Sequence, residues 1–494
     1  MNKRPRAVGL RRKINNASNP AQRLPHLTKS GYVFYDILSE NAMSVLLLSL
    51  LSCQDEVPPP PPKKEIAAPD IVLVIVDTLR SDHLGCYGYS RDTSPNIDAV
   101  AAEGLQFMRA YAQASWTLPS FVSLWTGLYP HEHRVGRAPD VLDVFGALPP
   151  ERVTLAEQLQ GQGYATGAVI NNTFLAPEFG VQQGFGDYMY RGADNTDFRS
   201  AAATNERALS WLKEVEDKPA FLVVHYMEPH MDLIPAKGVR GRYADPEKEL
   251  VPVPFRSPHA YELTQDQSKR TPEVVDYVRA LYDEEILDTD AAFGQLLRAL
   301  KKRERWDNTV LIVTADHGEE FWDHGEFEHG HTLRSVVTQV PLIVTGPGFK
   351  GMGKKDVLVE HVDLFQGILA LGGAPAPEES HGVNIFELAK LDEPPERWSL
   401  SENTLYGEPM VSVVTPQYRL LLNQFNGVAA LWNMNEDGGE GDVVAEDQRK
   451  AVADPILGSI RHLRGHFKPI EQVAGPQVPS QDTFQQLKSL GYIE

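Results

Sequence analysis

The most regular segment of the chain reads Ile71-Val72-Leu73-Val74-Ile75-Val76 and is followed directly by Asp77. Six consecutive apolar residues leave no polar face, so this segment predicts a strand that is buried on both sides in a parallel sheet. Similar apolar runs recur at 165–170, 221–224, 309–313 and 340–344. Their recurrence predicts several parallel strands in one sheet.

Helical patterns lie between these runs. They cover 154–159 and 281–303, and a further helical pattern at 359–371 follows the last run. The pattern at 281–303 carries one apolar stripe made of Leu281, Ile286, Leu287, Phe293, Leu296, Leu297 and Leu300. Strands that alternate with helices predict an α/β fold with a large, mostly parallel sheet covered by helices on both faces. Short, turn-bounded strands at 411–414, 418–422 and 430–432 predict an antiparallel meander. We therefore expect a main domain over 70–399 and a smaller C-terminal α+β subdomain with a tail over 400–494.

The N-terminal region reads as a leader and a linker. An apolar run at 44–52 is too short to span a bilayer as a helix. Leu50-Leu51-Ser52-Cys53 resembles a bacterial lipobox, which implies cleavage before Cys53 and a lipid on its thiol. Residues 1–52 are then a signal segment, and 53–69 form a proline-rich spacer. This reading predicts an envelope protein (periplasm or outer-membrane surface) with a membrane anchor at Cys53. An ordinary short signal peptide or a buried apolar segment are the alternatives.

The composition narrows the class of partner. A net charge of −20 and a pI near 5.2 argue against binding to nucleic acid. With two cysteines, the chain has no disulfide framework. An acidic protein that binds an anionic substrate needs a local positive centre, such as a metal ion.

Polar residues follow the predicted strands where the strands end. In open α/β sheets, ligands bind beyond the carboxyl ends of the strands. Asp77, Asp316 and His317 stand at such ends and together offer two carboxylates and an imidazole. This mixed set of ligands favours zinc or manganese, with calcium as the alternative that would prefer oxygen alone. Taken singly, each Asp could equally be a cap or turn residue.

The segment from Ser115 to Gly127 reads as a loop that enters a helix, with Pro119 in the first turn and Gly127 at the stop. Its Thr117 hydroxyl then lies at a helix N-terminus, where an anion is favoured. Alone, Thr117 is most simply an N-cap residue. Beside a divalent cation it becomes a candidate fourth ligand and nucleophile, because the cation lowers the hydroxyl pKa.

Over about residues 70–435 the chain resembles the sulfatase family of the alkaline phosphatase superfamily. Five segments carry this resemblance in the family's order: Asp77–Gly88, Ser94–Gly104, Leu118–His131, Thr314–Glu319 and Pro341–Gly348. The resemblance implies a metal-dependent hydrolase of sulfate or phosphate esters, with 70–399 as its catalytic domain. It also implies an anionic ester substrate, either a small molecule or a glycan, whose pocket is shaped by inserted loops such as 187–198 and 234–271.

Two positions depart from the formylglycine sulfatases. Those enzymes have Cys or Ser where this chain has Thr117, and Arg where it has Phe121. Threonine is a secondary alcohol, so its oxidation would give a ketone instead of the formylglycine aldehyde. Thr78 also stands where many sulfatases have a second metal-binding Asp. An unmodified threonine is similar to the phosphodiesterases and phosphoethanolamine transferases of the superfamily.

The resemblance also implies roles for further residues. His329 follows His317 by twelve positions, where sulfatases have a substrate-binding Lys and the transferases have a His that serves a second ion. His230 matches a histidine that contacts the anion, and either Asn171 or Asn172 holds a substrate oxygen. Arg80 either contacts the anion or braces its loop. The remaining candidates for substrate contact are His225, His324 and His331.

Each of these histidines has an alternative as a structural hydrogen-bonding residue. Two other functions also stay open at this point. One is a phosphoryl-group transferase of the phosphoethanolamine-transferase type. The other is a non-catalytic lipoprotein that binds glycans at the cell surface.

Overall fold

The computed structural model describes residues 68–137, 144–190, 199–435, 443–444, 450–458 and 479–489. The predicted leader, Cys53 and most of the linker lie outside these residues, so these predictions stay predictions.

The large sheet has the strand order β10-β2-β9-β6-β1-β5-β3-β4. Its strands are β1 (Asp70–Val76), β2 (Leu105–Tyr111), β3 (Ala165–Ile170), β4 (Asp187–Tyr190), β5 (Ala220–Tyr226), β6 (Thr309–Ala315), β9 (Gln339–Thr345) and β10 (Gly353–Glu360). Strand β1 pairs in parallel with β5 on one side and β6 on the other, and all of its residues are buried. The prediction of a central strand at 71–76 is therefore confirmed, and the fold is α/β with a mostly parallel sheet.

Strand β9 runs against its neighbours. It pairs antiparallel with both β6 and β2, whereas the pairs β10–β2, β1–β6, β1–β5, β3–β5 and β3–β4 are parallel. The sequence had grouped 340–344 with the parallel strands, and that part of the prediction was wrong. The reason is physical, because an apolar run with no polar face does not encode the direction of its strand. The chain enters β9 at the edge of the sheet where β6 ends.

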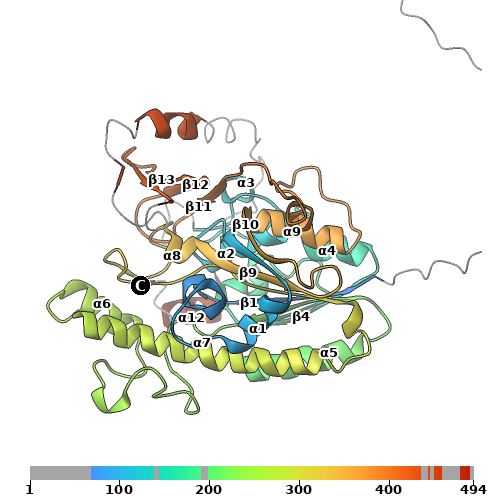
Figure 1. Ribbon diagram of the computed structural model, residues 1–494, viewed down its shortest axis with the longest axis horizontal. Helices are drawn as coiled ribbons and strands as arrows, with labels where there is room; N and C mark the ends of the chain where they lie inside the picture. The colour runs from blue at the N-terminus through green and yellow to red at the C-terminus, as the bar shows by residue number, and fades with distance from the viewer. Residues whose placement is uncertain are drawn as a thin grey trace, which may run out of the picture. The chain divides into compact units, whose positions relative to one another are not determined.

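Helices cover both faces of this sheet (Figure 1). On one face α1 (Pro95–Glu103) and α5 (Ala201–Glu214) pack against the long α7 (Pro272–Leu300), and on the other α2 (Thr117–Thr126) and α4 (Leu155–Gly161) pack against α9 (His361–Leu371). Helix α7 begins before the predicted residue 281, where the Thr271 side chain accepts a hydrogen bond from Val274 N. Helix α9 begins later than the predicted 359, because the preceding residues pair with β2 as the end of β10.

A second, antiparallel sheet follows in the order β11-β12-β13-β14. It consists of β11 (Ser399–Glu402), β12 (Met410–Val414), β13 (Tyr418–Asn423) and β14 (Ala429–Asn433), and it confirms the predicted meander. The shorter elements are α3 (Pro130–His133), α6 (Ser257–Gln265), α8 (Ser335–Thr338), α10 (Ile385–Leu388), and a hairpin of β7 (Glu320–Phe321) and β8 (Phe327–Glu328). Among the helices of the described part, none combines the length and the hydropathy needed to cross a bilayer.

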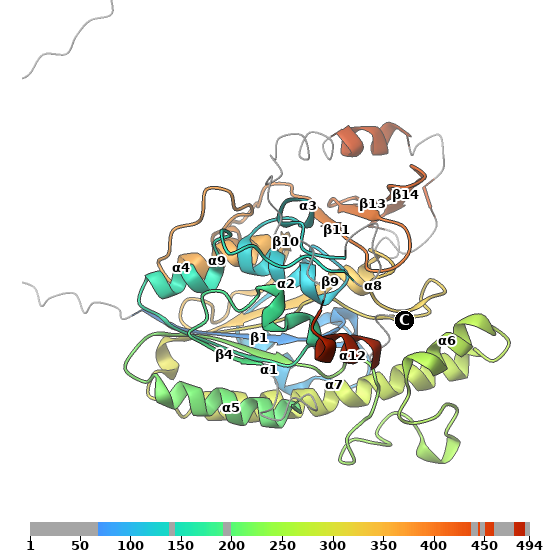
Figure 2. The same cartoon turned by 180° about the vertical axis from the view of Figure 1, so that it is seen from behind.

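Helix α12 (Gln481–Ser489), near the C-terminus, packs back on the main domain, as Figure 2 shows from behind. It contacts the short helical turn η3 (Thr173–Leu175), and its Leu487 side chain is fully buried in the main core. The C-terminal part of the chain thus reaches the sheet edge where β3 ends.

Candidate active site

Two neighbouring strands bring the predicted metal ligands together. Because β1 and β6 are parallel and Val76 pairs with Ala315, the next residues, Asp77 and Asp316, leave the sheet side by side. One ligand atom from each of Asp77, Asp316 and His317 lies within 4.8 Å of the others, and all three side chains are buried. The described residues thus contain a group that could hold a metal ion, as the sequence predicts.

The hydrogen bonds of this group leave suitable atoms unused. Oδ1 of Asp316 accepts from the backbone N–H groups of Thr78 at 3.3 Å and His317 at 2.9 Å. In contrast, Oδ2 of Asp316 and Oδ1 of Asp77 have no hydrogen-bond partner among the described residues. Nδ1 of His317 lies 3.0 Å from the Gly318 carbonyl oxygen, so Nδ1–H donates there and Nε2 keeps its lone pair. Buried oxygens without partners and an imidazole lone pair fit a divalent cation.

The electrostatics of the group point the same way. Burial raises the pKa of Asp316 well above its ordinary value, and the nearby carboxylate of Asp77 raises it further. Burial also opposes ionisation of Asp77, but His230 and His225 hold the pKa of this carboxyl below its usual range. Burial lowers the pKa of His317 to about 3, which keeps the ring neutral. Two buried carboxylates repel each other, and a bound cation would remove that repulsion.

The candidate nucleophile lies beside this group. Thr117 is the first residue of α2, and its Oγ1 is 3.4 Å from Nε2 of His317. Ser120, one turn later, donates from Oγ to the Asp316 carbonyl oxygen at 2.6 Å and so ties α2 to the end of β6. The helix stops at Gly127, as predicted, and the φ of 68° at this glycine is the left-handed conformation common at helix ends.

The structure distinguishes the two asparagines that the sequence left open. Asn172 donates from Nδ2 to Asp77 Oδ2 at 2.6 Å and to Thr117 Oγ1 at 3.2 Å. Asn171 faces away from the group and donates to Thr204 Oγ1 at 2.9 Å and to the His225 carbonyl oxygen at 2.5 Å. Neighbouring side chains at the end of an extended segment point in opposite directions, which explains the difference.

Three of the predicted histidines surround the group. Nε2 of His225 lies 3.4 Å from Asp77 Oδ2. The ring of His329 lies 4.5 Å from that of His317 and 5.1 Å from that of His230, measured between centroids. All three side chains are buried.

His331 and His324 are engaged elsewhere. Nε2 of His331 lies 3.0 Å from Glu320 Oε2, and the His324 backbone N–H donates to Oε1 of the same carboxylate at 2.8 Å. Both histidines thus contact Glu320 of the β7–β8 hairpin. These contacts fit the structural hydrogen-bonding role that the sequence left open for them.

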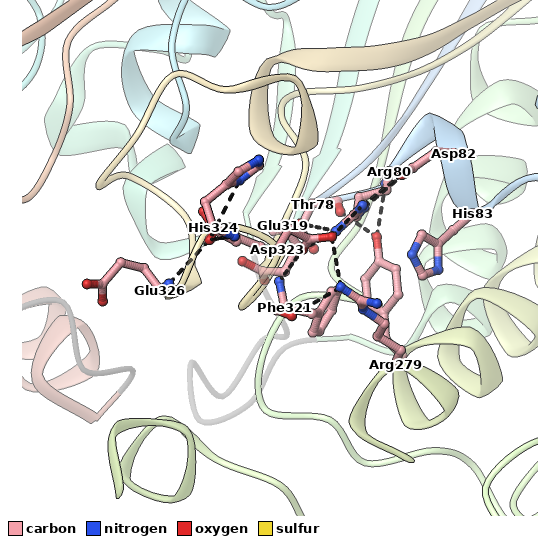
Figure 3. Close-up of polar contacts among 12 residues, drawn as sticks. Thr78, Arg80, Asp82, His83, Arg279, Glu319, Phe321, Asp323, His324 and Glu326 are labelled. Atoms are coloured by element: carbon pink, nitrogen blue, oxygen red, sulfur yellow. Dashed lines mark hydrogen bonds and ion pairs between the residues drawn. The ribbon is translucent and has the colours of Figure 1, made fainter. Parts of the chain in front are cut away.

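Arg80 also has a structural set of partners. Figure 3 shows its guanidinium between Asp82 and Asp323. Its five N–H groups point to these two carboxylates and to the Glu319 carbonyl oxygen, at 2.7–3.4 Å. With every donor used in this way, Arg80 braces its loop, and these contacts give no support to the catalytic role predicted for it.

Sequence reasoning assigned no role to Glu319, although the residue stands inside the quoted motif. Its Oε1 lies 3.0 Å from Nδ1 of His329, and burial raises the pKa of the Glu319 carboxyl to about 8. The only signal in the sequence was its position two residues after His317. Sequence reasoning also missed β2, the strand that delivers Thr117, because its residues lack a continuous apolar run.

Comparison with known proteins identifies the family of this chain. The sequence model of the family described as Sulfatase matches residues 69–374. The chain belongs to the sulfatase family. This sulfatase is 29% identical to human arylsulfatase A over 65% of its own length and 67% of the relative. It is 25% identical to the uncharacterized sulfatase YidJ of Escherichia coli K12 over 81% and 88%, respectively. The prediction of an ester-hydrolase enzyme is confirmed at the level of the family.

Solved structures of the same fold include a 2-O GAG sulfatase, which matches with a TM-score of 0.67 at 20% identity over 84% of this chain and 96% of that chain. The phosphonate monoester hydrolase of Agrobacterium radiobacter matches with a TM-score of 0.66 at 19% identity over 81% and 96%. At these identities, the likeness shows that this sulfatase shares their fold.

Proposed function

We propose that this sulfatase hydrolyses sulfate or phosphate esters, with Thr117 as an unmodified nucleophile beside a divalent cation held by Asp77, Asp316 and His317. One observation carries the proposal. Asn172 donates to both Thr117 Oγ1 (3.2 Å) and Asp77 Oδ2 (2.6 Å), so one amide joins the hydroxyl to the metal-ligand group.

In the proposed reaction each of these residues has one task. The bound cation would lower the pKa of the threonine hydroxyl and offset the charge of the substrate. Asn172 fixes the direction of Thr117 Oγ by donating to it. Thr117 gives its proton to water and its Oγ1 forms a bond to sulfur or phosphorus, while the bond from that atom to the leaving alcohol breaks and the alcohol takes up a proton from water. Water then cleaves the ester on the threonine and restores the hydroxyl.

His230 and His329 are proposed to contact the non-bridging oxygens of the ester. Their rings lie 5.1 Å apart, and His329 adjoins the His317 ring. Prearranged donors of this kind stabilise the charge that develops in the transition state. His225 is proposed to hold the Asp77 carboxylate in position through its Nε2, which lies 3.4 Å from Asp77 Oδ2. Zinc or manganese fits the mixed ligands best, and a second ion is an alternative use of His230 and His329.

The test is Thr117→Ala, assayed on an aryl sulfate, a phosphate monoester and a phosphodiester with metal content measured alongside. We expect turnover to fall by about 10³-fold or more, with unchanged thermal unfolding and unchanged metal content. Thr126→Ala is the matched control, because it removes a threonine hydroxyl from the last turn of the same helix. Undiminished turnover by Thr117→Ala would refute the assignment.

A phosphoryl-transfer variant of the same chemistry is supported by the unmodified Thr117 next to His329. In that case an acceptor alcohol, instead of water, takes the group from the threonine. Turnover of a phosphodiester in the presence of ethanolamine separates the two, because transfer gives a new diester that contains ethanolamine and hydrolysis gives a phosphate monoester. A non-catalytic glycan-binding lipoprotein is the less economical proposal, since binding alone does not require a buried hydroxyl among metal ligands.

We also propose that a lipid on Cys53 holds the enzyme in the bacterial cell envelope, which rests on the lipobox-like residues 50–53. Partition into detergent and the mass of the mature N-terminus test this. A wild-type protein that behaves like Cys53→Ala in both measurements would contradict it.

A further inference from the structure

The loop that carries Asp77 leaves β1 through a tight turn. Leu79 N–H donates to the Val76 carbonyl oxygen at 3.4 Å. Asp77 and Thr78 are therefore the two central residues of this turn. The backbone of Thr78 is left-handed, with a φ of 55°. Glycine or asparagine is usual at such a position, and a β-branched residue keeps this conformation only where its surroundings impose it. The turn therefore needs a support from outside itself.

The support comes from contacts to the backbone of Thr78 and not from its side chain. Among the residues that the structure describes, the buried Oγ1 of Thr78 has no hydrogen-bond partner. The Thr78 N–H donates to Asp316 Oδ1 at 3.3 Å, and the Thr78 carbonyl oxygen accepts from the Tyr282 hydroxyl at 2.7 Å. The same hydroxyl accepts from the backbone N–H of Arg80 at 2.9 Å. One phenol thus bridges the loop from residue 78 to residue 80.

Tyr282 is itself held in place by its neighbours. It lies in α7 and is fully buried. Its ring packs against those of His83 and Phe321, with 5.2 Å and 4.7 Å between the ring centroids. The next residue of the helix, Asp283, lies 2.6 Å from His83 Nδ1 through its Oδ1 and so fixes one of these two rings. A ring that is enclosed in this way has few other positions, so its hydroxyl is a fixed point for the turn.

We propose that Tyr282 is a positioning residue for the cation site, because its hydroxyl holds Thr78 in the left-handed conformation that the site needs. In this conformation the Thr78 N–H fixes Oδ1 of Asp316 and leaves Oδ2 to the cation, and the same turn sets the direction of Asp77. Hydrogen bonds that orient metal ligands strengthen the binding of the ion. The inference rests on the proposed function, because it concerns the cation that is assigned there.

The experiment titrates the metal-free protein with Zn²⁺ and with Mn²⁺, in competition with a chelator of known affinity. Tyr282→Phe keeps the ring and removes only the hydroxyl. We expect this variant to bind the ion that the wild type prefers about 10- to 100-fold more weakly. Tyr277→Phe is the matched control, because this tyrosine lies in the same helix and its hydroxyl accepts from Arg240 at 2.9 Å instead. The affinity of the control for the ion should equal that of the wild type.

A second comparison separates support of the turn from a general loss of packing. Glycine adopts a left-handed backbone without steric cost, so Thr78→Gly removes the need for the support. In the Thr78→Gly background, Tyr282→Phe should therefore weaken binding by no more than about 3-fold. A loss of packing unrelated to the turn would weaken binding equally in both backgrounds. Thermal unfolding in chelator checks that each variant is folded.

The outcomes keep the inference apart from the proposed function. If the wild type binds the ion and Tyr282→Phe binds it equally well, the inference is overturned and the proposed function stands. The same holds if Tyr277→Phe loses as much affinity, or if the loss is equal in both backgrounds. If the wild type takes up neither ion, the cation is removed from the proposed function and the inference is overturned with it.

Discussion

Two charged regions lie side by side at the carboxyl edge of the sheet, and they differ in how their polar atoms are used. Around Arg80, every guanidinium N–H has an acceptor, and the carboxylates of Asp82 and Asp323 are paired with it. In the metal-ligand group, Asp77 Oδ1 and Asp316 Oδ2 are buried without hydrogen-bond partners in the described part of the chain. The paired atoms of the first region indicate a structural role, and the unpaired atoms of the second indicate a site that can bind a ligand.

The difference has an energetic meaning. A buried polar atom without a partner costs about 1–3 kcal/mol, so such an atom calls for an explanation, and a bound cation supplies one for the two carboxylates. A guanidinium with all donors satisfied offers a substrate nothing without first breaking existing bonds. The comparison therefore predicts that changes in the first region affect stability, and changes in the second affect activity.

Asp316→Asn should have the largest effect on activity. Turnover is expected to fall by about 10³-fold or more, because cation binding weakens with the loss of a charged ligand. In chelator, the same variant should be more stable than the wild type by roughly 1 kcal/mol, or about 2 °C in Tm, since the repulsion with Asp77 is gone. Activity assays and thermal unfolding in chelator measure both. A metal-free variant less stable than the wild type would show that the carboxylates do not repel each other.

Arg80→Met should act mainly on stability. Removing the guanidinium leaves Asp82 and Asp323 without their cation, and we expect the free energy of unfolding to fall by about 2–4 kcal/mol. Urea unfolding measures this change, and kcat per folded molecule should stay within about tenfold of the wild type. A large loss of kcat at unchanged stability would contradict this prediction and support a catalytic role for Arg80.

The two adjacent asparagines give the same contrast within two residues. Asn172→Ala removes the donor to Thr117 and should lower kcat by about 10²-fold with a small change in stability. Asn171→Ala removes the donor to Thr204 and should cost roughly 1–3 kcal/mol of stability, with kcat nearly unchanged. Paired kinetics and unfolding curves test the contrast, which fails if the two variants lose kcat equally.

Glu319→Gln should flatten the pH dependence of stability in chelator. Burial raises the pKa of Glu319 from 4.5 to about 8 in the folded protein. Between these values the native state holds a proton that the unfolded state has released, so stability falls as pH rises, by at most about 1.4 kcal/mol per pH unit. Unfolding curves from pH 5 to 8 measure the slope, and equal slopes for the variant and the wild type would assign the effect to other groups.

The strand ends were predictable because their signal is local. A run such as 71–76 must be buried on both faces, and the residue after it must lie at an edge of the sheet. The positions of Asp77 and Asp316 are therefore predictable from the apolar residues that precede them. The helix that carries Thr117 was predictable for the same reason, since Pro119 and Gly127 mark its ends.

Features set by contacts between distant segments were not predictable. The direction of β9 depends on which edge the chain re-enters, and an apolar run does not encode this. The choice of Asn172 over Asn171 depends on where β1 and α2 place their side chains. The partners of Arg80 are Asp82, in the same loop, and Asp323, which lies far along the chain. Lys488 of α12, near the C-terminus, lines one cavity together with residues of α6.

The reversal of β9 has a consequence for the segment that precedes it. Because β6 and β9 are antiparallel neighbours, residues 316–338 leave and rejoin the framework at one edge. Both imidazoles at positions 317 and 329 are carried by this single excursion. Insertions in this segment away from Asp316, His317 and His329 would lengthen it without shifting the register of either strand, so the surroundings of the proposed site can change while the sheet stays the same.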